Sequence, residues 1–237
     1  MAENLKTGPH VHHATGFSAA AMAALCTILI ETHPRPPQRT GRPRALTTEQ
    51  EIRPTLVYHR RNRTQAELAE SFDVDQSSVS RAICRWTPRL AEALEDFIPT
   101  VDDLDSSRTL LVDGTLVPTY NWHGPGMRLY SGKHHCAGFN HQIICTLDGV
   151  PLVITDPVPG AHHDTFAYWW HGLDRFLDPH DTLADKGYQG LDLITPVKKL
   201  PGGELTDDEK HLNRHINHHR VVIERVIAHF KCWRVLS

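Results

Sequence analysis

The 237-residue chain has few cysteines and no long hydrophobic run, and these two features limit the classes of protein to which it can belong. Its five cysteines are odd in number and lack a Cys-x-x-Cys pair, which predicts reduced thiols rather than a disulfide framework. The 18 histidines show neither finger spacing nor a His-Glu-x-x-His motif, so we expect no zinc site. The apolar stretch over residues 17–30 is shorter than the roughly 20 residues that span a bilayer, and it lacks the basic leader of a signal peptide. These absences predict a cytoplasmic protein without a membrane segment.

Charge is distributed unevenly along the chain, although the net charge is only −3. Residues 101–210 contain twice as many Asp and Glu as Lys and Arg, whereas Glu224 is the only acid in residues 211–237. Residues 35–63 contain eight arginines and two acids. An acidic centre between basic ends is typical of an enzyme that gathers metal and also holds a polyanion.

Residues 1–100 are expected to form a small all-α domain. Thr64 and Glu67 make a capping box that opens a helix over residues 65–72. After a tight turn, residues 76–86 form a second helix, and this helix-turn-helix pattern favours DNA binding, although any helical hairpin shows the same periodicity. The polar side chains on the open side of the second helix are the candidate DNA contacts: Gln76, Ser77, Ser78, Arg81 and Arg85.

Two residues of this domain depart from the usual pattern. Asp73 stands in the turn where glycine is common, although Asp tolerates a left-handed conformation. Pro54 falls inside the preceding helical pattern, residues 49–61, and should kink or shorten that helix.

A Pro- and Arg-rich segment, residues 32–44, precedes the helix-turn-helix pattern. Its prolines keep the backbone extended. Arg42 and Arg44 could lie in a DNA minor groove, where the negative potential attracts arginine. An ordinary solvated linker is an equally good interpretation of the same composition.

Residues 101–237 are expected to form a separate α/β domain. Asp148-Gly149 is a strong hairpin signal between two strands, and Asp164 is a natural N-cap for the helix that follows. The predicted elements are strands at 109–112, 139–147, 150–155 and 182–184, an amphipathic helix at 165–177 and a final helix from about 208 to 233.

Three acids occupy defined places in this domain. Asp113 is expected where the first strand ends, before a glycine; Asp185 follows the strand at 182–184; and Glu224 lies in the final helix. Crowded carboxylates repel one another, and oxygen ligands suit Mg²⁺ or Mn²⁺, of which two can support in-line displacement at a phosphodiester. Taken singly, the acids have ordinary explanations, as two turn residues and a helix residue paired with Arg220.

Five short motifs occur in a characteristic order. They are Val112-Asp113-Gly114-Thr115, Tyr130-Ser131-Gly132-Lys133, Pro159-Gly160-Ala161-His162-His163-Asp164, Ala184-Asp185-Lys186-Gly187-Tyr188, and Ile223-Glu224-Arg225 leading to Phe230-Lys231-Cys232-Trp233-Arg234. In this order the chain resembles the DDE transposases of bacterial insertion sequences and, more distantly, the Harbinger-type transposases of eukaryotes. The resemblance implies an RNase H-like mixed sheet with flanking helices behind a helix-turn-helix domain. It also implies that Asp113, Asp185 and Glu224 are the catalytic, metal-binding acids.

The function implied by the resemblance is metal-dependent cleavage and transfer of DNA strands at the ends of an insertion sequence. The expected cofactor is a pair of Mg²⁺ or Mn²⁺ ions, and the expected partner is double-stranded DNA, bound by a homodimer at the bacterial nucleoid. Candidate phosphate contacts in the catalytic domain are Lys133, Lys186, Arg220, Arg225 and Lys231. Asp164 is interpreted as a helix cap rather than as a fourth metal ligand.

The short C-terminus leaves a second interpretation open. The chain stops 13 residues after Glu224, whereas the catalytic helix of the family is followed by further sequence. A truncated transposase remnant that only binds DNA is therefore the alternative to an active enzyme. In that case the apolar side chains of residues 230–236 are expected to be poorly covered.

Overall fold

The computed structural model describes residues 12–36, 43–98, 100–101, 104, 108–119 and 126–236. The chain forms two compact units, which are described one at a time. The first comprises residues 1–97 and 232–235, and the second comprises residues 98–231 and 236–237. The candidate DNA contact Arg42 lies outside the described residues.

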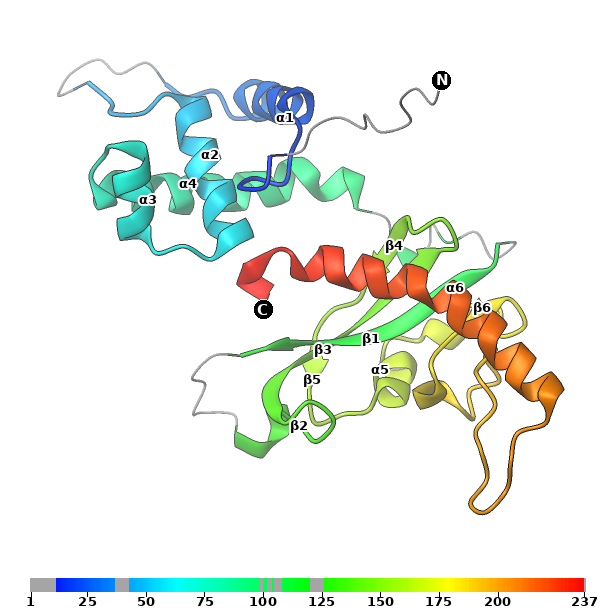
Figure 1. Ribbon diagram of the computed structural model, residues 1–237. Coiled ribbons are helices and arrows are strands. Elements are labelled where there is room, and N and C mark those ends of the chain that lie inside the picture. The colour runs from blue at the N-terminus through cyan, green and yellow to red at the C-terminus, as the bar shows by residue number, and fades with distance from the viewer. Residues whose placement is uncertain are drawn as a thin grey trace, which may run out of the picture. The chain divides into compact units, whose positions relative to one another are not determined.

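The first unit is all-helical. Its helices are α1 (Ala19–Thr32), α2 (Thr48–Arg61), α3 (Gln65–Phe72) and α4 (Gln76–Leu94), followed by a 3₁₀ turn at Glu95–Phe97 (Figure 1). Side chains satisfy the free N–H groups at three of the helix starts. Ser18 caps α1, and two reciprocal capping boxes join Thr47 to Gln50 and Thr64 to Glu67. The predicted capping box of α3 is confirmed.

Helix lengths in this unit differ from the sequence-based expectation in two places. The helix α2 runs through Pro54 to Arg61, so the predicted shortening is wrong. A proline removes one backbone hydrogen bond, and here the buried face of α2 packs against α4, which offsets that loss. The helix α4 extends past Trp86 to Leu94. Asp73 adopts the left-handed conformation expected of the turn, with φ of 52°.

A buried carboxylate ties the helices of the first unit together. Glu51 on α2 is 6% exposed and accepts three charged or polar donors. Arg85 Nη1 lies 2.7 Å and Trp86 Nε1 2.9 Å from its Oε2, and Arg35 Nη2 lies 2.9 Å from its Oε1. Arg85, a candidate DNA contact, is thus paired within the unit, and its side chain is 29% exposed.

Trp233 belongs to the first unit rather than lying uncovered. Its ring meets Phe17 edge-on at a centroid separation of 6.5 Å, and the Arg60 guanidinium carbon lies 5.2 Å from the same ring. The expectation that this tryptophan lacks cover is therefore wrong, whereas Val235 is 47% exposed.

The second unit is a mixed sheet flanked by helices. Its elements are β1 (Leu110–Pro118), β2 (Tyr130–Ser131), β3 (Cys136–Thr146), β4 (Pro151–Ile154), β5 (Val158–Pro159), α5 (Asp164–Trp170), β6 (Thr182–Leu183) and α6 (Asp207–Lys231), with 3₁₀ turns at Gly126–Leu129, Leu173–Arg175, Lys186–Tyr188 and Arg234–Leu236. The strand order is β2-β3-β1-β6, and β4 and β5 also pair with β3. β6 runs parallel to β1, and the other pairs are antiparallel. The predicted α/β class is confirmed.

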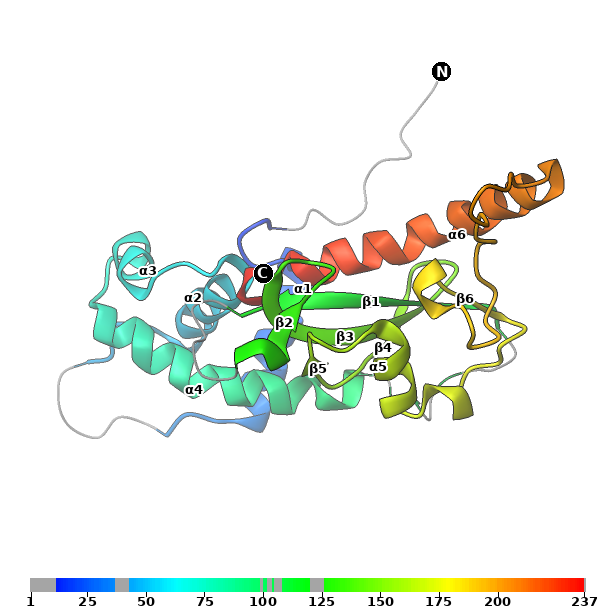
Figure 2. The ribbon, with the colours of Figure 1, turned by 90° about the horizontal axis from the view of Figure 1, so that it is seen from below.

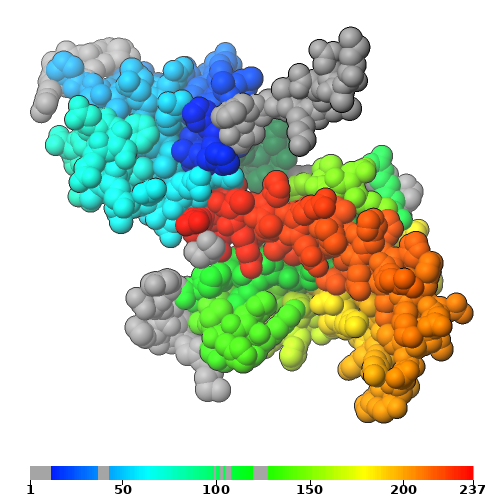
Figure 3. Space-filling model, viewed as in Figure 1, coloured from blue at the N-terminus to red at the C-terminus, as the bar shows by residue number. Residues whose placement is uncertain are grey.

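Helices cover the two faces of this sheet (Figure 1). On one face, Val112 and Ile144 pack with Tyr168 of α5 and with Tyr188. On the other face, Leu111 and its neighbours pack with buried isoleucines of α6. The view turned by 90° shows α6 extending along the length of β1 (Figure 2), and its outward side forms part of the surface (Figure 3). The sheet therefore has an α5 face and an α6 face.

Two predicted elements of the second unit have different limits in the structure. β1 continues through Asp113 to Pro118, so the expected strand exit at Asp113 is wrong. The helix α5 ends at Trp170, and Gly172 with φ of 62° separates it from the following 3₁₀ turn. Trp169 and Trp170, at the end of α5, are 55% and 69% exposed.

Among the described residues, no helix is long and apolar enough to cross a membrane.

We predict that Glu51→Ala destabilises the first unit by about 1–3 kcal/mol, because it leaves the partly buried guanidinium groups of Arg35 and Arg85 without their shared acid. Urea unfolding followed by circular dichroism measures the change. Glu70→Ala removes an exposed acid from α3 and should alter stability by less than about 0.5 kcal/mol. Equal losses of unfolding free energy in the two variants would show that the ion pairs of Glu51 do not stabilise the first unit.

Candidate active site

The pairing of β1 with β6 places two acids side by side. Leu111 pairs with Leu183 in parallel register, and both leucines pack on the α6 face. Side chains alternate between the faces of a strand, so the residue two positions after each leucine returns to the same face. Those residues are Asp113 and Asp185, whose juxtaposition follows from the register.

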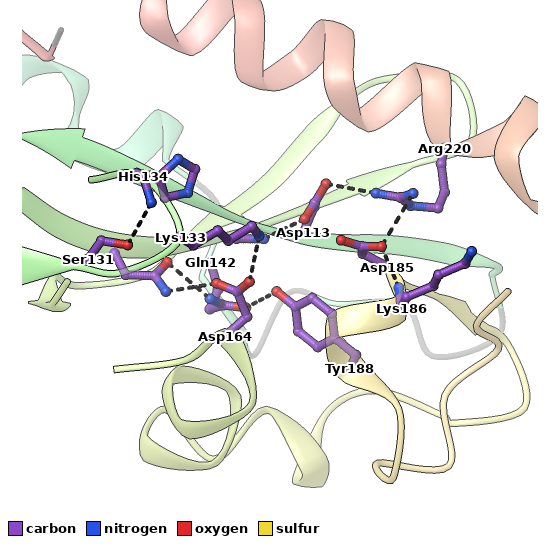
Figure 4. Close-up of polar contacts among 12 residues, drawn as sticks. Asp113, Ser131, Lys133, His134, Gln142, Asp164, Asp185, Lys186, Tyr188 and Arg220 are labelled. Carbon is purple, nitrogen blue, oxygen red and sulfur yellow. Dashed lines mark hydrogen bonds and ion pairs between the residues drawn. The ribbon is translucent and has the colours of Figure 1, made fainter. Parts of the chain in front are cut away.

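Arg220 of α6 lies between these two carboxylates (Figure 4). Its Nη2 donates to Asp113 Oδ2 at 3.2 Å, and its Nη1 lies 3.7 Å from Asp185 Oδ1. The Arg220 and Asp113 side chains are 13% and 12% exposed, and the Asp185 side chain is 30% exposed. One guanidinium thus spans a largely desolvated acid pair.

The surroundings of Asp113 leave its negative charge incompletely balanced. Burial raises the pKa of Asp113 above its ordinary value, and the charges of Asp185 and Asp164 raise it further. Arg220 and the backbone N–H of Gly114, 2.8 Å from Asp113 Oδ1, oppose this rise. The net pKa remains raised, so the site as it stands favours additional positive charge.

Glu224 lies one helical turn after Arg220 on α6 and is exposed. Residues four apart on a helix lie on the same surface, so Glu224 is on the same side of α6 as Arg220. Within the described residues, no three Asp, Glu, His or Cys side chains are gathered closely enough to hold a metal ion. The structure therefore brings Asp113 and Asp185 together but does not gather Glu224 with them.

A polar network lies beneath β1 on the α5 face (Figure 4). Asp164 Oδ1 accepts from Asn140 Nδ2 at 2.8 Å, and Asp164 Oδ2 lies 3.3 Å from Lys133 Nζ. Gln142 accepts from the Tyr188 hydroxyl and donates to Asn140 at 3.4 Å. The N-cap of α5 is His163, so the expectation that Asp164 caps this helix is wrong; its carboxylate serves the network instead.

Comparison with known proteins identifies the family of this chain. Residues 112–237 match the family described as DDE superfamily endonuclease, and residues 44–96 match the helix-turn-helix of DDE superfamily endonuclease. The chain belongs to the DDE superfamily of endonucleases. Its mixed sheet and N-terminal helical unit are consistent with the RNase H-like catalytic fold and the DNA-binding domain that the sequence predicted.

Two relatives are assigned as transposases. The protein assigned to insertion sequence element IS112 of Streptomyces albus G is 30% identical over 200 residues, covering 84% of this chain and 74% of the relative. The protein assigned to IS702 of Microchaete diplosiphon is 24% identical over 209 residues, covering 84% of this chain and 75% of the relative. No solved structure matches the chain.

The candidate phosphate contacts of the endonuclease have different surroundings. Lys186 and Arg225 are exposed, and the Lys186 backbone N–H donates to the Asp185 carboxylate. Lys133 is 59% exposed at its side chain and paired with Asp164. Lys231 is half-buried, and burial lowers the pKa of its ammonium. Arg220 is held by two acids, yet its buried Nε has no partner among the described residues.

Sequence reasoning missed the network on the α5 face of the endonuclease. Asn140 and Gln142 are two polar residues at alternate positions of strand β3, and both are buried. Buried polar side chains are usually hydrogen-bonded, so this alternation was a usable signal. Tyr188, the last residue of the motif that contains Asp185, is fully buried and belongs to the core.

Gly114 is required by the position of Asp164. A Cβ added at Gly114 would overlap the Asp164 carboxylate, whereas one added at Gly132 would meet nothing within 4 Å. We predict that Gly114→Ala destabilises the second unit by about 1–3 kcal/mol, while Gly132→Ala does not. Urea unfolding measures both variants, and equal stabilities would mean that Asp164 shifts without cost.

The raised pKa of Asp113 gives a stability prediction with a defined sign. Between the unfolded pKa and the higher folded pKa, the folded protein binds the proton more tightly, so stability falls as pH rises through this window. Asp113→Asn removes this penalty and should raise the melting temperature at pH 7. The gain should shrink as pH falls through the folded pKa, and Asp174→Asn, at an exposed acid, should show no such trend. A lower melting temperature for Asp113→Asn at pH 7 would contradict the argument.

Proposed function

We propose that this endonuclease is a transposase that cuts and joins DNA strands at the ends of an insertion sequence, with Asp113 and Asp185 at its catalytic centre. The observation that carries the proposal is the adjacent placement of these two carboxylates on the α6 face. The family match and the relatives assigned as transposases support the same reaction class. Strand cleavage at a phosphodiester is the chemistry for which such acids are suited.

The residues at this centre fit divalent cations. Asp113 and Asp185 offer hard oxygen ligands, and the raised pKa of Asp113 indicates that more positive charge would be accommodated. We propose that these two acids and Glu224 hold Mg²⁺ or Mn²⁺, with two ions bound. Ions held there would activate the attacking hydroxyl and offset charge on the leaving oxygen.

The chain's own cations have complementary roles in this proposal. The guanidinium of Arg220 offsets the repulsion between the two acids. Exposed Lys186 and Arg225 add positive charge for the DNA backbone, as does Lys133 beyond its pairing with Asp164. Lys231, whose pKa is lowered by burial, is the weakest of these candidate contacts.

The helix-turn-helix unit would select the DNA. Gln76, Ser77 and Arg81 are exposed on the second helix of the motif, where base edges and phosphates are contacted. Two ends must be cut and joined together, which a homodimer on the element termini in the bacterial cytoplasm would accomplish. The catalytic interpretation is favoured over a remnant that only binds DNA.

We predict that Asp113→Ala, Asp185→Ala and Glu224→Ala each abolish Mg²⁺-dependent cleavage of DNA carrying the element ends, while binding to that DNA persists. Removing an acid does not weaken attraction to phosphate, so loss of binding is not expected. Gel-based cleavage and binding assays measure the two activities, and chelation of the metal should reproduce the loss of cleavage. Asp181→Ala, at an exposed acid near β6, is the control.

Full cleavage by Glu224→Ala would remove that residue from the proposed ligand set and leave the aspartates in place. Full cleavage by Asp113→Ala or Asp185→Ala would overturn the proposed catalytic centre.

A further inference from the structure

A cavity of about 260 Å³ opens in the helical first unit beside the start of α4. Four of the residues that line it are arginines, whereas two are acids. The lining residues that carry the argument are Arg35, Arg44, Arg81, Arg85, Glu51 and Asp75. Such an excess of guanidinium groups around one hollow is typical of an anion site.

The two sides of this cavity differ in how far their charged groups are paired. Glu51 is shared by Arg35 and Arg85, so each charged side chain on this side has an ion-pair partner, with two cations to one acid. Arg44 and Arg81 are exposed, and neither has an acid partner among the described residues. Asp75 is the remaining acid, which leaves the lining with net positive charge.

Arg35 carries a donor with no acceptor. Its Nη2 pairs with Glu51, but its Nη1 is buried and has no hydrogen-bond partner within the described part of the chain. A buried unpaired donor costs free energy of the order of 1–3 kcal/mol, so such groups usually have a ligand or another partner. Here the donor belongs to a side chain that lines the positively charged cavity.

Local hydrogen bonds hold the two exposed arginines at the cavity. Arg81 Nη2 lies 3.2 Å from Ser77 Oγ and 3.3 Å from Ser78 Oγ, which turns its side chain back toward the first turn of α4. Arg44 Nη2 donates to the Pro36 carbonyl oxygen at 2.9 Å. Both side chains are therefore positioned before any ligand arrives, which lowers the entropy cost of binding.

From these contacts we infer that Arg35, Arg44 and Arg81 form a single binding site for one phosphate of the DNA backbone, with Glu51 and Arg85 as its support. The inference rests on the proposed DNA-binding function and assigns a site within it. A phosphate has the charge and the oxygen acceptors that three guanidinium groups require. Backbone phosphates fix the position of a recognition helix on the duplex without reading sequence. Arg85 then acts through Glu51 as a positioning residue.

The first test measures how binding of a mixed-sequence DNA duplex to the full chain depends on salt. Each neutralised phosphate contributes about 0.9 to the slope of log affinity against log salt. Arg44→Gln and Arg81→Gln should each lower this slope by about 0.9, and the double variant should lower it no further, because both side chains serve one phosphate. Arg53→Gln, at an exposed arginine on α2 outside the cavity, should leave the slope unchanged.

Additive decreases in the double variant, or an unchanged slope in either single variant, would overturn the shared phosphate site. Both substituted side chains are exposed, so we expect the variants to stay folded. Circular dichroism melts of each variant check that a changed salt slope does not come from unfolding. If the unsubstituted chain binds the duplex but does not cleave element ends, the proposed catalysis fails while this inference stands.

A second test uses inorganic phosphate without DNA. Phosphate should shift the guanidinium NMR signals of Arg35 in the unsubstituted chain, and it should do so much less in Arg81→Gln. A phosphate response combined with unchanged DNA salt slopes would identify a site for free anions only, which overturns the assignment to DNA. No response of Arg35 at any phosphate concentration would also contradict the inference.

Discussion

The second unit depends on Arg220 and the two carboxylates between which it lies. Parallel pairing of Leu111 with Leu183 forces Asp113 and Asp185 onto one face, where burial makes their mutual repulsion costly. The guanidinium of Arg220 offsets that repulsion from a helix packed on the same face. The packing of α6 is therefore coupled to the charge of the site: a shift of the helix would leave two acids without their cation. Conversely, cations bound to the acids would compete with Arg220 for the same oxygens.

The α5 face of β1 carries a polar network that helps to fix the position of Asp185 on the other face. Gly114 lacks a side chain, and the space is taken by the Asp164 carboxylate. That carboxylate joins Asn140, and through Gln142 the network reaches Tyr188, three residues after Asp185. Buried polar networks are stable only when their members are satisfied, so they fix a unique geometry. The turn that carries Asp185 is thereby anchored to the central strands rather than left to the loop.

Local signals in the sequence predicted much of the fold. The capping box at Thr64, the Asp-Gly hairpin and the apolar period of α6 are short-range features, and each has its expected counterpart in the structure. The errors arose where tertiary packing decides. The sequence predicts a turn at Asp113 because Gly114 follows it. In the structure β1 pairs with β3 as far as Pro118, so the strand continues through Asp113 and Gly114. Among the described residues Glu224 is not gathered with the aspartates, and how a helix is placed on a sheet is a tertiary feature that the period of α6 does not specify.

Two buried carboxylates show how structural and functional acids differ in this chain. Glu51 meets Arg35, Arg85 and Trp86, so its oxygens are supplied with donors from three segments. We expect its removal to disturb folding, because two guanidinium groups would lose their shared carboxylate. Asp113 meets one guanidinium while two further acids act on it, and its raised pKa records the deficit. Burial is the largest cause of that raised pKa, followed by the neighbouring acids. A buried acid of this kind lowers stability, and perturbed pKa values of this kind cluster at functional sites. The same criterion applied to cations separates Arg85, which is fully engaged, from Arg35, whose free Nη1 still requires an acceptor.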